Sequence, residues 1–205
     1  MDSRKILLVN LSKGLLGELD TQLLGMLIIG KIFTAAMNRV TSRMERRSPM
    51  FLYVDEFQNF TTDTVAYLLS EARKFGLFLT LANQNLAQLS ANSGKQNILE
   101  AVLGNVGTLL LFRLGAMDAG RMDIYTRPDL QAQDLQKLPD FHAAGRLLVK
   151  NSPSKPLVFK TQPALEVTDG IDVNSIITKS MRKYATPTKE VEEGITARSY
   201  MYKHC

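Results

Sequence analysis

The eleven residues at positions 50–60, M-F-L-Y-V-D-E-F-Q-N-F, constrain the fold of this chain more than any other stretch. An uninterrupted apolar run at 51–54 leads directly into Asp55 and Glu56. Such a run predicts a strand buried on both faces, as in the centre of a parallel sheet. Carboxylates at the carboxyl end of that strand would lie where open α/β sheets bind ligands. A strand that ends in a solvated acidic turn remains the alternative.

Composition sets the class of protein. The chain has 205 residues, of which 45% are hydrophobic and 22% charged, as in a soluble globular protein with a sizeable core. The net charge of +5 is compatible with a polyanionic partner and does not require one. Cys205 is the only cysteine, so the chain cannot form an internal disulfide, and a reducing compartment such as the cytoplasm is expected.

A helical pattern covers residues 18–43 and is apolar almost all round in its middle. Its most membrane-like part, 23–37, is interrupted by Lys31 and is shorter than the ~20 residues that a membrane span needs. We therefore expect a buried helix, covered on most sides by a sheet and by neighbouring elements. The amino-terminal residues lack the apolar core and cleavage site of a signal peptide.

The rest of the first 125 residues alternates between apolar runs and helical patterns. Strands are expected at 5–11, 51–54, 77–82 and 107–113, and further helices at 65–75, 86–89, 96–103 and 116–125. This alternation predicts a parallel, three-layer α/β sheet. Polar residues end each strand, and in a parallel sheet they would converge on one edge: Ser12 and Lys13, Asp55 and Glu56, Asn83 and Gln84, and Arg113.

Beyond residue 125 the pattern changes. Runs at 145–150 and 156–162, joined by the turn 151–155, predict a β-hairpin at the edge of the sheet. Residues 163–170 are expected to be a linker, and 172–184 an amphipathic helix with basic last turns. Residues 185–205 have few apolar anchors and are expected to be loosely ordered. We thus expect two domains, 1–163 and 164–205.

The strand-end residues have both structural and catalytic interpretations. Asp55 and Glu56 fit the Walker B pattern of P-loop ATPases, in which the Asp helps hold Mg²⁺ and the Glu orients or deprotonates the attacking water. Gln84 is either a cap in a strand-to-helix turn or a side-chain amide that senses phosphate. Arg73 either stabilises a helix carboxyl end or acts as an arginine finger. Arg113 either pairs with Asp118 or reaches a phosphate.

Several kinds of site have no support in the sequence. There is no G-x-x-x-x-G-K-[ST] loop, and neither Lys13-Gly14 nor Gly94-Lys95 has the required spacing. A chain without that loop cannot build an ordinary ATP site by itself. His142 and His204 are isolated from other metal-ligating residues, and no Ser-His-Asp pattern or nucleophile elbow is present.

The ordered combination of motifs resembles one family. It is carried by K-I-L-L-V-N-L-S-K-G, F-L-Y-V-D-E-F-Q-N-F, L-L-S-E-A-R-K-F-G-L, T-L-A-N-Q-N-L-A-Q-L, G-N-V-G-T-L-L-L-F-R-L-G and R-L-L-V-K-N-S-P-S-K-P-L-V-F-K-T-Q-P, between residues 5 and 163. These segments resemble the carboxyl-terminal half of the motor domain of FtsK/HerA-like ATPases. Within them they are most similar to the TraG/TraD-type coupling proteins of conjugative type IV secretion.

The resemblance implies a partial RecA-like three-layer core and a set of roles. Asp55 would bind Mg²⁺, Glu56 would be the catalytic carboxylate, and Gln84 the γ-phosphate sensor. Arg73 would be a finger acting on a neighbouring subunit, and Arg113 a weaker phosphate contact. The cofactors would be ATP and Mg²⁺. The partners would be DNA bound without sequence readout, a hexameric ring of identical subunits, and relaxase or secretion-channel proteins.

The departure from the family is the missing amino-terminal half of the motor, which carries the Walker A loop. The chain is therefore expected to be the carboxyl-terminal fragment of a DNA-translocating ATPase, cytoplasmic or held at the inner membrane by an anchor outside this sequence. The alternative is a non-catalytic binding or assembly module that derives from such a motor and does not bind ATP.

Overall fold

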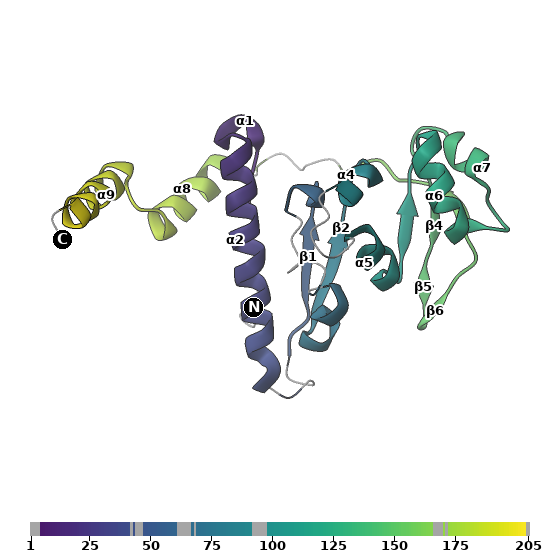
Figure 1. Ribbon diagram of the computed structural model, residues 1–205, viewed down its shortest axis with the longest axis horizontal. Coiled ribbons are helices and arrows are strands. Elements are labelled where there is room, and N and C mark those ends of the chain that lie inside the picture. The colour runs from purple at the N-terminus through teal and green to yellow at the C-terminus, as the bar shows by residue number, and fades with distance from the viewer. Residues whose placement is uncertain are drawn as a thin grey trace. The chain divides into compact units, whose positions relative to one another are not determined.

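The structure is a computed structural model that describes residues 5–41, 43, 47–60, 67, 69–91, 98–165, 170 and 172–203. The chain divides into two compact units, Met1–Gln162 and Pro163–Cys205. Among the residues that the structure describes, all the strands lie in the first unit, and the second contains two helices. Figure 1 labels the elements along the chain.

The first sheet is a parallel pair. β1 (Met50–Val54) pairs with β2 (Leu77–Leu81), with Met50 opposite Leu77 and Val54 opposite Leu81. Both predicted strands and their parallel direction are therefore confirmed. Burial on both faces is wrong, because the side chains alternate: Leu52 is half-buried, whereas Phe51 and Tyr53 are 62% and 73% exposed.

Helix α2 (Glu18–Met37) is the reason for this alternation, because it covers one face of the pair and runs beside both strands (Figure 1). A small apolar cavity lies between them, lined by Ile29, Leu52, Val54, Phe57, Phe60, Leu79 and Leu81. Gly25 permits the close approach, since a Cβ atom there would lie 2.2 Å from Cε1 of Phe60. The helix continues into the 3₁₀ turn η1 (Asn38–Thr41).

The other sides of α2 are exposed, so the expected cover on most sides is not found. Leu19 is 80% exposed, and Leu23 and Leu27 are each 54% exposed. By length and composition alone Glu18–Thr41 could cross a membrane, with a mean hydropathy of 1.4 in its most apolar window and 17% of that window buried. Core helices pass the same test, and the packing of Gly25 on Phe60 shows that one face of α2 serves as core.

The strand expected at 5–11 is wrong. Residues 5–12 have no regular structure, and Ile6 and Leu8 are 89% and 86% exposed. An apolar run specifies burial but not its partner, and within the described residues no strand pairs with this segment. It leads into a single helical turn, α1 (Lys13–Leu16).

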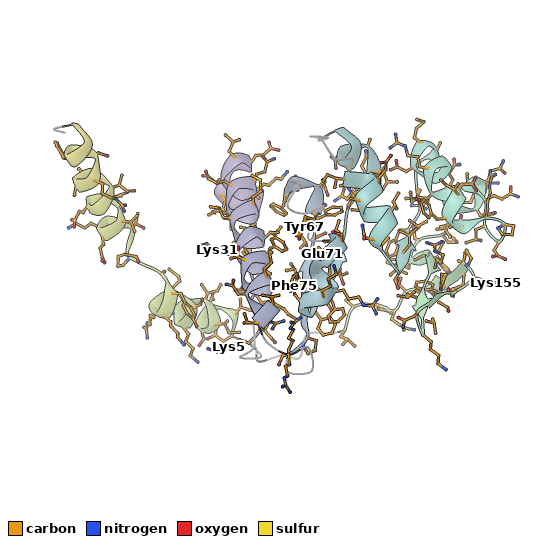
Figure 2. All side chains as sticks on the ribbon, turned by 60° about the horizontal axis from the view of Figure 1, so that its bottom comes forward. Lys5, Lys31, Tyr67, Glu71, Phe75 and Lys155 are labelled. Carbon is orange, nitrogen blue, oxygen red and sulfur yellow. The ribbon has the colours of Figure 1, made fainter. Side chains whose placement is uncertain are left out.

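The segment between β1 and β2 returns the chain to the start of the sheet. Residues 69–71 are helical and continue into η4 (Ala72–Phe75), which ends at Gly76 in the left-handed conformation. Of the helix expected at 65–75, residues 65, 66 and 68 lie outside the described residues. Figure 2 shows Tyr67, Glu71 and Phe75 together in this segment beside α2, and the Tyr67 ring meets Phe33 of α2 edge-on at 5.7 Å.

After β2 come α4 (Leu86–Ala91) and α5 (Ile98–Asn105), as expected to within a few residues. The next strand, β3 (Leu109–Leu111), does not join β1 and β2. It pairs antiparallel with β4 (His142–Arg146), which pairs antiparallel with β7 (Leu157–Lys160). The prediction of one mostly parallel sheet is therefore wrong for 107–113, because β4 offers this short strand a complete antiparallel partner.

The predicted hairpin is confirmed and is longer than expected. β4 and β7 form its base, and β5 (Leu148–Val149) and β6 (Ser152–Pro153) form its tip. α6 (Ala116–Thr126) and α7 (Ala132–Gln136) pack on β3 and β4 through a core of Leu111, Ala119, Met122, Leu135, Leu138 and Ala144. Leu86 of α4 packs against the same core, and its amide donates to Asp118 at 3.2 Å.

The second unit contains α8 (Val173–Tyr184) and α9 (Thr188–Lys203). The amphipathic helix at 172–184 is confirmed, with Asp172 as its N-cap. The loose order expected after residue 185 is wrong as far as Lys203, and 204–205 lie outside the described residues. Helix formers are concentrated in the first half of α9, at Lys189, Glu190, Glu192 and Glu193.

Candidate functional site

The carboxyl ends of β1 and β2 bring together two residues that are 28 positions apart. Gln84 Nε2 donates a hydrogen bond to Glu56 Oε1. Two backbone hydrogen bonds between the ends of the strands fix the distance between these residues. Ala82 N donates to Val54 O at 3.0 Å, and Phe57 N donates to Ala82 O at 3.1 Å. The expected convergence of these two strand ends is therefore found.

Glu56 lies in an unusual backbone conformation. Its φ is +50°, in the left-handed region that side chains other than glycine seldom adopt. The residues that follow hold it there: η3 (Phe57–Phe60) buries Phe57 and Phe60 to 4% and 8% exposure. Backbone strain of this kind costs about 1–3 kcal/mol and concentrates at functional sites.

Three further polar residues complete what we call the carboxyl-edge cluster, which consists of Asp55, Glu56, Gln58, Asn83 and Gln84. Gln58 is 7% exposed and donates from Nε2 to Glu56 Oε2 at 2.5 Å. Asn83 Nδ2 reaches Gln58 Oε1 at 3.5 Å. Gln58 was missed by sequence reasoning, because only the η3 turn brings its side chain back beside Glu56. Both Glu56 oxygens thus accept from a side-chain amide.

Lys13 also lies beside this edge. Its Nζ donates to Asn59 Oδ1 at 3.0 Å and pairs with Glu18 at 3.6 Å. The strand expected before Lys13 is absent, yet the residue still reaches the turn that follows Glu56. This contact makes Lys13 a cation near the cluster.

The resemblance implies ATP and Mg²⁺, and the cluster fits only the metal side of such a site. Asp55 is exposed, and its Oδ1 accepts from the Glu56 amide at 3.0 Å. Mg²⁺ is commonly held by one or two carboxylates together with waters and phosphate oxygens. Across the described ranges no three His, Cys, Asp or Glu side chains gather as a metal site. The sequence contains no G-x-x-x-x-G-K-[ST] loop, which holds the phosphates in P-loop ATPases.

Arg73 lies at the opposite end of the strands. It is an exposed residue of η4, four positions before β2 begins, whereas Gln84 follows the end of β2. A five-residue strand spans roughly 17 Å, so Arg73 and Glu56 do not meet within one chain. Neighbouring Lys74 donates to Glu71 at 2.7 Å, and this hydrogen bond raises the pKa of Lys74 above its usual range.

Arg113 is not brought to the cluster either. It follows β3, which belongs to the second sheet, and its Nη2 pairs with Asp140 Oδ1 at 2.8 Å. The pairing considered from the sequence, with Asp118, is not the one observed, because Asp118 accepts from the Leu86 amide. The ion pair is exposed and therefore contributes little to stability.

Comparison with known proteins places this geometry in a family context. Residues 49–122 match a family model described as the TraM recognition site of TraD and TraG. This segment is therefore similar in sequence to that part of TraD and TraG. It includes the entire carboxyl-edge cluster and Arg73. A comparison with curated protein sequences gave no match.

Solved structures of the bacterial conjugative coupling protein TrwB have a similar fold. The unbound form aligns with a TM-score of 0.53 at 13% identity, covering 67% of this chain and 37% of that one. The complex of TrwB with the ATP analogue ADPNP gives 0.55 at 14%, covering 71% and 38%. The complex with ADP and Mg²⁺ gives 0.53 at 14%, covering 66% and 36%.

At this level of identity the similarity establishes the fold. The predicted partial core of a P-loop ATPase is thereby confirmed as a fold, with the change in strand pairing described above. The chain spans less than two fifths of the length of these TrwB chains.

Proposed function

We propose that this TraG/TraD-type chain is the carboxyl-terminal part of a DNA-translocating ATPase motor and supplies the hydrolytic half of its nucleotide site. The observation that carries the proposal is the Glu56–Gln84 contact, since it joins the expected carboxylate and amide at the ligand-binding edge of a parallel sheet. The similarity to TrwB, crystallised with nucleotide and Mg²⁺, supports the same assignment.

In this proposal each residue has a definite task. ATP bound with Mg²⁺ would supply the phosphoryl group whose transfer to water drives movement. Asp55 would hold the metal through its carboxylate. Glu56 would orient the attacking water and accept its proton, while the amide of Gln58 keeps one of its oxygens aligned. Gln84 Nε2 would exchange its bond to Glu56 for a phosphate oxygen and so report the state of the nucleotide.

The proposal extends to assembly and substrate. Arg73 lies too far from Glu56 to act within one chain, which favours a finger that reaches the site of a neighbouring copy in a hexameric ring. Exposed leucines on α2, such as Leu19 and Leu23, offer apolar surface for such contacts. The protein would bind DNA through the DNA phosphates, without sequence readout. It would act on the cytoplasmic side of the inner membrane.

An ATPase assay tests the hydrolytic role. The chain is combined with a polypeptide that carries the Walker A half of a TraG/TraD-type motor, and turnover is measured for Glu56→Gln, Gln84→Ala and the control Gln88→Ala. Loss of a general base lowers kcat by about 10²–10⁴. Gln88 is exposed on α4, outside the cluster, so its variant should keep full activity. Turnover that survives Glu56→Gln would remove the catalytic assignment.

A second candidate is a docking module that does not hydrolyse ATP. It is favoured by the missing phosphate loop and by the description of the matched family as a TraM recognition site. Partners would then be a TraM-type protein, with relaxase or secretion-channel proteins as further possibilities. Calorimetric binding of a TraM-type protein that is unchanged by Glu56→Gln, together with no turnover in the complemented motor, would favour this candidate.

A further inference from the structure

Helix α8 is amphipathic, and its apolar side is uncovered. Five side chains on it are between 50% and 72% exposed: Val173, Ile176, Ile177, Met181 and Tyr184. At 100° per residue they fall within a sector of roughly 140°, which is a continuous apolar stripe. The helix is well formed, because the Asp172 side chain caps it by accepting from Ser175 N at 3.1 Å. An exposed apolar stripe of this kind is typical of an interaction surface.

The charges on α8 have one sign. Lys179, Arg182 and Lys183 are exposed, and the helix contains no acidic residue. On the same helical wheel Lys179 and Lys183 lie along one border of the stripe, and Arg182 lies opposite it. Lys183 Nζ also lies 5.2 Å from the centre of the Tyr184 ring. Long basic side chains beside an apolar face can extend their ammonium groups toward headgroups while their stems stay in hydrocarbon.

We propose that α8 is a membrane-surface helix that docks on an anionic lipid bilayer. Such a surface takes both halves of the helix at once, because acyl chains cover the stripe while lipid phosphates meet the three cations. DNA would satisfy the cations but leave five apolar side chains in water. With 12 residues, about 18 Å, α8 is too short to span a bilayer and lies in the plane of the interface.

The absence of tryptophan from the sequence makes a direct test possible. Tyr184→Trp in the full chain places a single indole near the angular centre of the stripe, in the last turn of α8. Its emission should shift to the blue with vesicles of phosphatidylcholine and phosphatidylglycerol, and stay unchanged with phosphatidylcholine alone. The control Met117→Trp, exposed to 79% on α6, should not shift with either vesicle. No shift at position 184, or an equal shift with neutral vesicles, overturns the proposal.

Charge variants test the electrostatic half in a vesicle co-sedimentation assay. Each basic residue near an anionic surface contributes about 1 kcal/mol, or about a fivefold change in partitioning. Lys179→Gln with Lys183→Gln should therefore weaken binding about 30-fold. The control variant, Lys31→Gln with Lys155→Gln, removes the same charge from the first unit at two exposed positions labelled in Figure 2. Its vesicle binding should change little. If the α8 double variant and the control double variant weaken vesicle binding equally, the proposal is overturned.

The apolar half is tested with Ile177→Glu, which should abolish sedimentation while the first unit keeps its fold, as judged by circular dichroism. Fluorescence anisotropy with a labelled oligonucleotide separates the nucleic-acid alternative. If the α8 charge variants weaken binding to DNA and leave vesicle binding intact, α8 is a nucleic-acid contact and the membrane assignment is wrong.

Discussion

Gly25 is the position at which α2 touches the turn that carries the candidate site, and replacing it with alanine tests that contact. A Cβ atom there would lie 2.2 Å from Cε1 and 2.3 Å from Cδ1 of Phe60. Phe60 is 8% exposed, so its ring cannot swing into solvent without breaking η3. Overpacking costs about 1–3 kcal/mol, and a contact this short belongs at the upper end of that range.

Gly30, five residues later in the same helix, provides the matched control. Nothing lies within 4 Å of a Cβ atom at Gly30, so Gly30→Ala should simply gain about 1 kcal/mol of helix propensity. Gly25→Ala gains the same amount and loses about 3 kcal/mol to the clash. The two variants should therefore differ by about 3 kcal/mol in the free energy of unfolding.

Thermal unfolding followed by circular dichroism measures this difference. In a chain of this size 1 kcal/mol moves Tm by about 2–4 °C, so Gly25→Ala should melt some 6–12 °C below Gly30→Ala. Adding Phe60→Leu to Gly25→Ala should recover part of the loss, because the smaller side chain leaves room for the methyl group. If both alanine variants shift Tm equally, α2 does not pack on Phe60. The conclusion that this helix supports the turn after Glu56 would then be wrong.

Three other changes have defined outcomes. Leu135→Ala, in a fully buried position of the second sheet's core, should cost about 2–5 kcal/mol in a urea titration. Asp172→Ala removes the cap of α8 and should cost about 1 kcal/mol of helix stability, seen as lost helical circular dichroism, whereas Asp172→Asn should keep the signal. Glu71→Gln should lower the pKa of Lys74 toward 10.5 in an NMR titration. Because that pKa is raised in the fold, the pair stabilises the protein below pH 10.5 and loses its effect as the pH rises through the folded value.

The contacts that were predictable from the sequence are those between elements that follow one another along the chain. β1 and β2 are consecutive strands joined by one crossover, so their apolar runs and the rule for parallel connections together determine the pair. The meeting of Glu56 with Gln84 follows from that pairing alone. Gln58 does not follow from it, because its position depends on how tightly η3 turns.

Long-range partners were not predictable in the same way. The amino-acid sequence of 107–113 is compatible with a parallel or an antiparallel strand. The direction is determined by pairing with β4, which the sequence of this segment does not reveal. The run at 5–11 has strong strand character, yet a strand forms only where a neighbouring edge is available. Helix α9 was not predicted, because loose order was inferred from the small number of apolar residues. Local helix propensity, which does not depend on burial, was not considered.

The parallel direction of β1 and β2 gives this unit two chemically different ends. Carboxylates and amides gather at one end, and at the other Arg73 stands beside a backbone held by Arg39, which donates to Phe75 O at 3.1 Å. Identical copies that met end to end through these surfaces would each present a different face to the next. Such a contact is heterologous, and repeated it produces a closed ring or an open filament, in either case an assembly with a built-in sense of direction.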